Sequence, residues 1–185
     1  EEMLAEPKPD LESEFMTGIW HYGRALAYIH TNRITEAHRE LRPLRVAQEA
    51  MGNVEHYIGF STAKTLLIIA HEVVKGELAY VEGHTLEGLA HLERAVRLED
   101  GLRYNEPPDW YFPVRHFLGA MLLDAGRPNE AEVVYAADLR KNPENGYSLF
   151  GLKIALEQQG KHEDALAITK RFGRAWAGAT HKLTS

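Results

Sequence analysis

A spacing of 34 residues in the second half of the chain constrains the fold more than any other feature. Shifting the sequence by 34 positions aligns Leu118 with Leu152, Gly126 with Gly160, and Ala131 with Ala165. Periods of 20–50 residues are typical of repeated supersecondary units that bury their apolar faces against one another. The sequence therefore predicts consecutive helix–turn–helix units in this half of the chain.

Each matched position has a physical role in such a unit. Gly126 and Gly160 stand where the first helix of a unit must end, since glycine tolerates the left-handed backbone of the cap. Ala131 and Ala165 lie early in the second helix, where a small side chain allows two helices to approach closely. Pro143 follows the second helix of the earlier unit and prevents that helix from continuing.

Two further units precede these at longer and irregular spacing. One has Gly83 in the turn and Gly88 at the small position, and it ends at Gly101. In the first unit Asn32 replaces the turn glycine. Pro43 falls inside the second predicted helix of that unit, so we expect a kink or an early end there.

These residues resemble the tetratricopeptide repeat (TPR) family, most clearly in the two C-terminal units. The resemblance implies an all-α fold, an α-solenoid of antiparallel helix pairs forming a TPR-like right-handed superhelix of about four repeat units. It also implies a concave groove that receives a peptide or a helix. Residues 18–22, 70–71 and 104–115 are further similar to the C-terminal region of longer uncharacterised bacterial TPR proteins, which implies that an N-terminal array is missing from this chain.

The expected domain organisation is simple. We expect a disordered acidic leader over residues 1–10, one helical-repeat domain over 11–179 and a flexible tail over 180–185. Asp109 is the predicted N-cap of the helix that follows the Pro107–Pro108 pair. Trp110, in the aromatic run after it, is predicted to pack between units, with a role in binding as the alternative.

Composition excludes several classes of partner and site. A formal charge of −6 weighs against nucleic acid, which binds proteins with a surplus of Lys and Arg. The absence of cysteine excludes disulfides, a thiolate nucleophile and a zinc ribbon. The longest apolar run, residues 66–70, is too short to span a bilayer, so no membrane insertion is expected. We expect a cytoplasmic location, with the periplasm left open.

No motif indicates catalysis, a cofactor or a resident metal, and none of these is expected. Of the ten histidines, no two are four residues apart, the spacing that places two ligands on one helix face. The run from His71 to Lys75 begins like the zinc-protease helix, but Lys75 replaces the second histidine. No serine stands in a nucleophile motif. A histidine-based metal site, with weak support from the spacing of His84 and His91, remains an open alternative.

The implied groove gives the candidate site. Aligning the first helices of the four units puts aromatic, aliphatic and acidic residues on the concave face, which suits an apolar peptide or an amphipathic helix. The predicted groove residues are Tyr22, Leu26, Ile29, Val73, Glu77, Tyr80, His116, Leu123, Phe150, Ile154 and Glu157. These positions lack the basic residues that would grip a C-terminal carboxylate. The sequence thus predicts a protein-interaction scaffold that binds another protein or peptide. Two alternatives remain: that several of these residues pack against neighbouring helices, and that the chain is a self-association domain forming a homo-oligomer.

Overall fold

The computed structural model describes residues 2–9, 13–52, 56–180 and 183, and these residues are mostly helical. The helices are α1 (Glu2–Ala5), α2 (Glu14–His30), α3 (Ile34–Ala50), α4 (Ala63–Val81), α5 (Thr85–Asp100), α6 (Val114–Asp124), α7 (Pro128–Lys141), α8 (Gly146–Gln158) and α9 (His162–Ala175). The predicted all-α class is confirmed. A small antiparallel hairpin, β1 (Tyr57–Ile58) with β2 (Ser61–Thr62), was not predicted.

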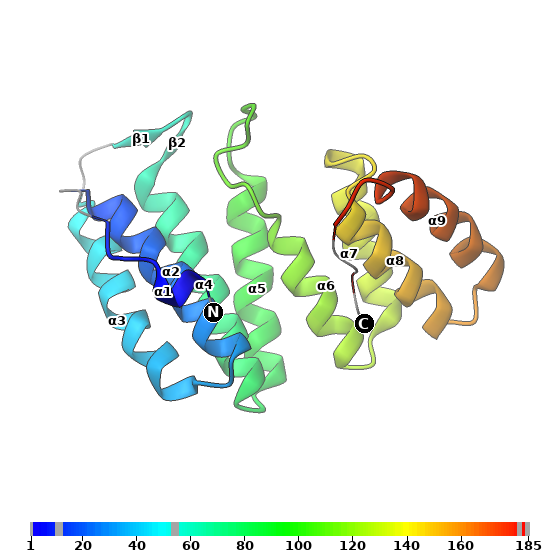
Figure 1. The fold of residues 1–185 in the computed structure, drawn as a ribbon, viewed down its shortest axis with the longest axis horizontal. Coiled ribbons are helices and arrows are strands. Elements are labelled where there is room, and N and C mark those ends of the chain that lie inside the picture. Colours follow the sequence, from blue (N-terminus) through cyan, green and yellow to red (C-terminus); the bar gives the residue numbers. More distant parts are fainter. Residues whose placement is uncertain (1, 10–12, 53–55, 181–182, 184–185) are drawn as a thin grey trace. The chain divides into compact units, whose positions relative to one another are not determined.

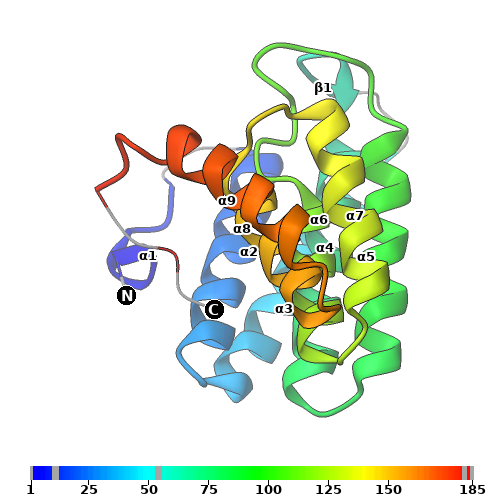
Figure 2. The same cartoon turned by 90° about the vertical axis from the view of Figure 1, so that its right-hand side faces the viewer.

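The helices form four consecutive pairs within two compact units, Glu1–Tyr111 and Phe112–Ser185 (Figures 1 and 2). In the first unit α2 pairs with α3 and α4 with α5, and α4 packs on both helices of the preceding pair. In the second unit α6 pairs with α7 and α8 with α9, and α8 likewise packs on both α6 and α7. We call the first helix of each pair the A helix and the second the B helix. The predicted helix–turn–helix units are therefore confirmed.

The turns inside the pairs have the predicted backbone. Gly83, Gly126 and Gly160 have φ values of 86°, 70° and 73°, the left-handed region in which glycine carries no steric penalty. Asn32 adopts the same conformation, with φ 57°, in the first pair. Asparagine is among the few other residues that visit this region, and for this reason it can replace glycine there.

The conformation of Asn32 gives a first testable prediction. Asn32→Gly is expected to raise the free energy of unfolding by up to about 1 kcal/mol, because it removes the side chain from a left-handed position. Gly126→Ala makes the opposite change and is expected to lower it by about 1 kcal/mol. Urea unfolding followed by circular dichroism measures both. A loss of stability with Asn32→Gly would contradict the role of this residue.

The close approach of paired helices depends on the predicted small residues. A Cβ built on Gly76 would lie 2.8 Å from Leu92 Cγ and 3.2 Å from the carbonyl oxygen of Gly88. Ala131 and Ala165, at the corresponding early position of α7 and α9, are buried. Small side chains at these positions therefore allow the A and B helices to pack in contact.

Three details of the sequence prediction differ from the structure. Helix α3 continues through Pro43, so the predicted early end is wrong. Leu44 and Ala47, which follow the proline in that helix, are both buried, and this packing favours the helix despite the backbone hydrogen bond that proline cannot make. Asp109 does not cap a helix, because α6 begins only at Val114. The segment expected to be a disordered leader contains α1.

Asp109 instead connects two segments of the first unit. Its Oδ2 accepts a hydrogen bond from the Phe60 amide over 3.0 Å, and its Oδ1 accepts one from Asn105 Nδ2 over 2.6 Å. The carboxylate thereby ties the hairpin to the segment after α5. No helix among the described residues combines the length and the apolar character that crossing a membrane requires.

Candidate protein-binding surface

The structure divides the predicted groove residues into two groups. Four of them are buried, with 8% or less of their surface exposed: Tyr22, Ile29, Val73 and His116. The other seven keep accessible surface: Leu26, Glu77, Tyr80, Leu123, Phe150, Ile154 and Glu157. Within each unit, the accessible residues define what the A helices can offer to a ligand.

Tyr22 is covered by a residue that follows α5. The Trp110 ring lies 5.5 Å from the Tyr22 ring, centroid to centroid, and both side chains are buried. Burial, with smaller contributions from Tyr111 and Glu77, raises the pKa of the Tyr22 hydroxyl. The prediction that Trp110 packs in the protein is therefore confirmed, and it explains why Tyr22 is not accessible.

In the first unit the accessible predicted residues are Leu26 on α2 with Glu77 and Tyr80 on α4. The Glu77 carboxylate lies 4.0 Å from His30 Nε2 at the end of α2. This set joins one aliphatic and one aromatic side chain with one carboxylate.

In the second unit Phe150 belongs to a larger aromatic cluster. Its ring lies 5.5 Å from that of Phe172, which stacks on Trp176 at 5.7 Å with an interplanar angle of 21°. Trp176 in turn contacts Tyr147 edge to face at 5.3 Å. All four rings are partly accessible, and Lys153 Nζ lies 5.9 Å from the Phe150 ring. We name Tyr147, Phe150, Phe172 and Trp176 the aromatic cluster.

Sequence reasoning found only Phe150 of this cluster. The alignment of the four units covered only the exposed positions of A helices. Phe172 lies in the B helix α9, and Trp176 is the C-cap of that helix. A usable signal was present in the sequence: Tyr147 and Phe150 are three residues apart, and Phe172 and Trp176 four. Such spacing places side chains on one helix face.

His116 belongs to a buried polar cluster in the second unit. Asp138 Oδ2 accepts a 2.5 Å hydrogen bond from the Ser148 hydroxyl, and its Oδ1 accepts one of 2.8 Å from Asn142 Nδ2. His116 Nε2 lies 3.4 Å from Asp138 Oδ2, beyond the usual distance of a well-formed hydrogen bond. Burial raises the pKa of Asp138, but His116, Ser148 and Asn142 outweigh it and hold the pKa below its usual range.

This cluster contains the residue types of a hydrolase triad in a different order. In a triad the histidine stands between the serine and the carboxylate and accepts the serine proton. Here Ser148 donates to Asp138 directly, and the serine side chain is fully buried. The arrangement stabilises the contact between α7 and α8 and does not activate a nucleophile.

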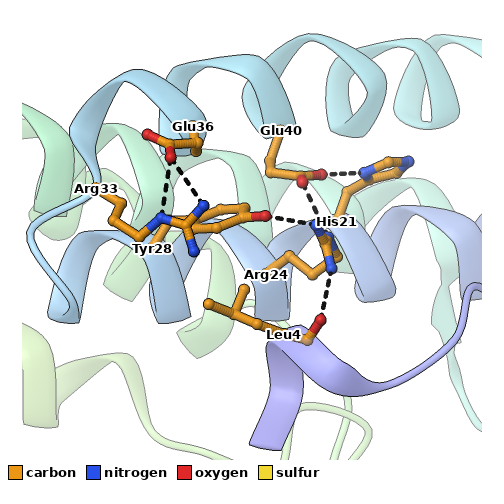
Figure 3. Close-up of polar contacts among 7 residues, drawn as sticks. All are labelled: Leu4, His21, Arg24, Tyr28, Arg33, Glu36 and Glu40. Atoms are coloured by element: carbon orange, nitrogen blue, oxygen red, sulfur yellow. Dashed lines mark hydrogen bonds and ion pairs between the residues drawn. The ribbon is translucent and has the colours of Figure 1, made fainter. Parts of the chain in front are cut away.

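Other histidines also pair with carboxylates across helices. His21 Nδ1 on α2 lies 2.6 Å from Glu40 Oε2 on α3. Figure 3 draws this contact as a dashed line. His91 Nδ1 on α5 lies 2.7 Å from Glu72 Oε2 on α4. Each of these pairs joins the two helices of one helix pair. Within the described ranges, no three His, Asp or Glu side chains converge in a way that could hold a metal ion.

Comparison with known proteins identifies the fold. No family model matches the sequence, and no curated protein matches it either. A crystal structure of nearly identical TPR-like repeats, from a Podosopora anserina protein assigned as a kinesin light chain, is similar over 94% of this chain and 82% of that one, with a TM-score of 0.57 and 17% identity. A point variant of the same protein aligns over 95% and 82%, with a TM-score of 0.56 and 16% identity. The chain therefore has a TPR-like helical-repeat fold.

Proposed function

We propose that this chain is a protein-interaction scaffold whose A helices bind a peptide or a helix of another protein. The observation that carries the proposal is the partly accessible set of predicted groove residues on the A helices of both units. Within each unit, consecutive helix pairs present the same face of their A helices, as helical repeats generally do. The TPR-like fold supports the proposal, since it is generally used for protein binding.

The accessible side chains indicate the chemistry of the ligand. Tyr80 and Phe150 are large and aromatic, and such residues dominate the binding energy at protein interfaces. Glu77 and Glu157 place a carboxylate on the same A helix as each of them. A ligand with apolar residues at helical or extended spacing, accompanied by Lys or Arg, would match both features.

The experiment compares two variants, each with two large side chains replaced by alanine. The test variant carries Tyr80→Ala and Phe150→Ala on A helices. The control carries Leu86→Ala and Val133→Ala on B helices, where those side chains are 79% and 67% exposed. His116 is unsuitable for the test because it is buried.

An affinity pull-down with each protein, read by mass spectrometry, identifies candidate partners, and titration with the purified partner measures affinity. We expect the test variant to bind at least about tenfold more weakly, as loss of interface aromatics predicts. The control should bind like the unmodified chain. Equal binding by both variants would contradict an A-helix site.

Self-association is a second candidate, favoured by the last helix. Leu166 on α9 is 57% exposed, whereas Ala165 beside it is buried. An apolar side chain at this position could contact a second copy of the chain. Light scattering across a dilution series should then show a dimer that Leu166→Glu converts to a monomer. A monomer at all concentrations would exclude this candidate.

A further inference from the structure

A short helix near the start of the chain covers one patch of α2. Met3 lies over Gly23: a Cβ built on Gly23 would be 3.1 Å from both the Sδ and the Cε of Met3. The next residue, Leu4, directs its main-chain carbonyl at Arg24, whose Nη1 donates to it over 3.3 Å (Figure 3). Two consecutive residues of α1 thus meet two consecutive residues of α2. Figures 1 and 2 both show the two helices side by side.

The absence of a side chain at Gly23 leaves room for Met3. Gly18, in the same helix, is used differently: its position is filled by Leu67 of α4 and Ala47 of α3, as in ordinary core packing. The three nearest heavy atoms to a Cβ built on Gly23 all belong to Met3 of α1. The glycine at this position therefore forms a slot that a methionine side chain occupies.

Arg24 is held in place by residues outside α1. Its Nε donates to Glu40 over 2.9 Å and its Nη2 to the Tyr28 hydroxyl over 2.6 Å, and the guanidinium lies 4.6 Å from the Trp20 ring. These partners belong to α2 and α3, so the guanidinium keeps its orientation whether or not α1 is present. A donor fixed before binding loses little freedom when a ligand arrives.

The contact made by Arg24 suits the end of a helix. The last four carbonyls of a helix have no partner within it, and a cation near them is favourable. Helix α1 has four residues and is closed by one further bond, from the Glu6 amide to the Glu2 carbonyl. A helix of one turn is not stable alone in water. Its conformation therefore depends on the surface of α2 that it contacts.

We propose that Gly23 and Arg24, which we name the Gly23 site, recognise a single helical turn that places a methionine over the glycine and a free carbonyl at the next residue. Helix α1 is the internal occupant of the site. The external ligand is a short helical segment of a partner protein with a Met-Leu pair, which displaces α1. The inference rests on the proposed function, because it assigns a ligand of stated chemistry to the A helix of the first pair.

Internal occupancy controls how strongly an external ligand binds. A tethered segment acts at an effective concentration of roughly millimolar. A free helix must compete with it, so its apparent Kd for the unmodified chain is the Kd of the open site divided by the fraction of molecules in which α1 is undocked. Opening the contact should therefore increase the affinity for an external helix.

The test uses the full ¹⁵N-labelled chain and nuclear magnetic resonance, which detects binding even at millimolar affinity. In the opened variant, Met3→Asp with Leu4→Asp, the Gly23 amide and Arg24 Nε resonances should shift. A synthetic peptide with the sequence of residues 1–9 should move them back, and it should bind the opened variant at least about tenfold more tightly than the unmodified chain.

A second substitution, Gly23→Leu, is added to the opened variant to block the Gly23 site. Leucine fills the slot, and because it is a better helix former than glycine it does not weaken α2. We expect it to reduce peptide binding at least about tenfold, with the circular dichroism spectrum unchanged. Equal peptide binding with and without Gly23→Leu would overturn the proposal.

Three other results would also overturn it. They are unmoved resonances in the opened variant, no response to millimolar peptide, and equal affinity for the opened and unmodified chains. Resonances of the unmodified chain that change with protein concentration would show that α1 docks on a second copy. None of these results affects the partner test at Tyr80 and Phe150, so failure of the Gly23 site and failure of the proposed function are distinguishable.

Discussion

Gly151→Val is expected to lower the free energy of unfolding by about 3 kcal/mol, the upper part of the range for overpacking a core. A Cβ on Gly151 would lie 2.1 Å from Cζ of Tyr135, whose ring is buried between two glycines. On its other side, a Cβ on Gly119 would lie 2.4 Å from the same atom. The ring cannot move away from one helix without approaching the other, so the added side chain must displace α6, α7 or α8.

Gly173→Val is the matched control for this prediction. Gly173 is helical and exposed in α9, and a Cβ there would meet no atom within 4 Å. Its substitution should change stability by less than about 0.5 kcal/mol, the difference in helix propensity. In the Gly151→Val variant, Tyr135→Leu should restore at least about 1 kcal/mol of the lost free energy of unfolding. A double-mutant cycle measures this coupling. Similar losses at Gly151 and Gly173 would contradict the packing described here.

Asp138→Ala is the second substitution with a large expected effect. It is expected to lower the free energy of unfolding by about 3 kcal/mol. The change removes hydrogen bonds from Ser148 and Asn142 and leaves the Ser148 hydroxyl, which is fully buried, without its acceptor. Breaking a buried polar network on one side typically has an effect of this size. Thermal and urea unfolding measure it, and a change below about 1 kcal/mol would contradict the role of the cluster.

The same carboxylate predicts the direction of a pH effect. The pKa of Asp138 is held below its usual range in the folded protein. Its ionised form therefore stabilises the fold at pH values above the unfolded pKa of about 4. This contribution is lost as the pH falls through the folded pKa, because the folded carboxylate must then be protonated. Asp138→Asn should remove this part of the pH dependence of the free energy of unfolding. If the dependence between pH 5 and 2 were the same in the variant and the unmodified chain, this role of Asp138 would be contradicted.

The sequence predicted those parts of the fold that depend on the backbone of a few residues. Left-handed turns at Gly126 and Asn32 and the close packing at Gly88 follow from local requirements that only certain residues satisfy. The hairpin could not be predicted in this way. It depends on the Phe60 amide meeting Asp109, a residue 49 positions away, and no local pattern records such a contact.

The candidate site was predicted less completely for a related reason. Helical spacing shows which face of an A helix points away from its own pair, but it does not show what covers that face. Tyr22 has the expected spacing and is nevertheless buried beneath Trp110. Gly23 is covered by Met3. Phe150 remains partly accessible because its aromatic neighbours lie beside it and do not enclose it.

Site-specific photo-crosslinking shows whether the A helices contact another protein. A photoreactive phenylalanine analogue would replace Tyr80 or Phe150 on A helices and, in separate proteins, Leu86 or Val133 on B helices. Each protein would be illuminated with the purified partner. If the A helices bind the partner, we expect crosslinks from positions 80 and 150 that excess unlabelled chain suppresses, and none from 86 or 133. Crosslinks of equal yield from all four positions, or from the B-helix positions alone, would contradict it.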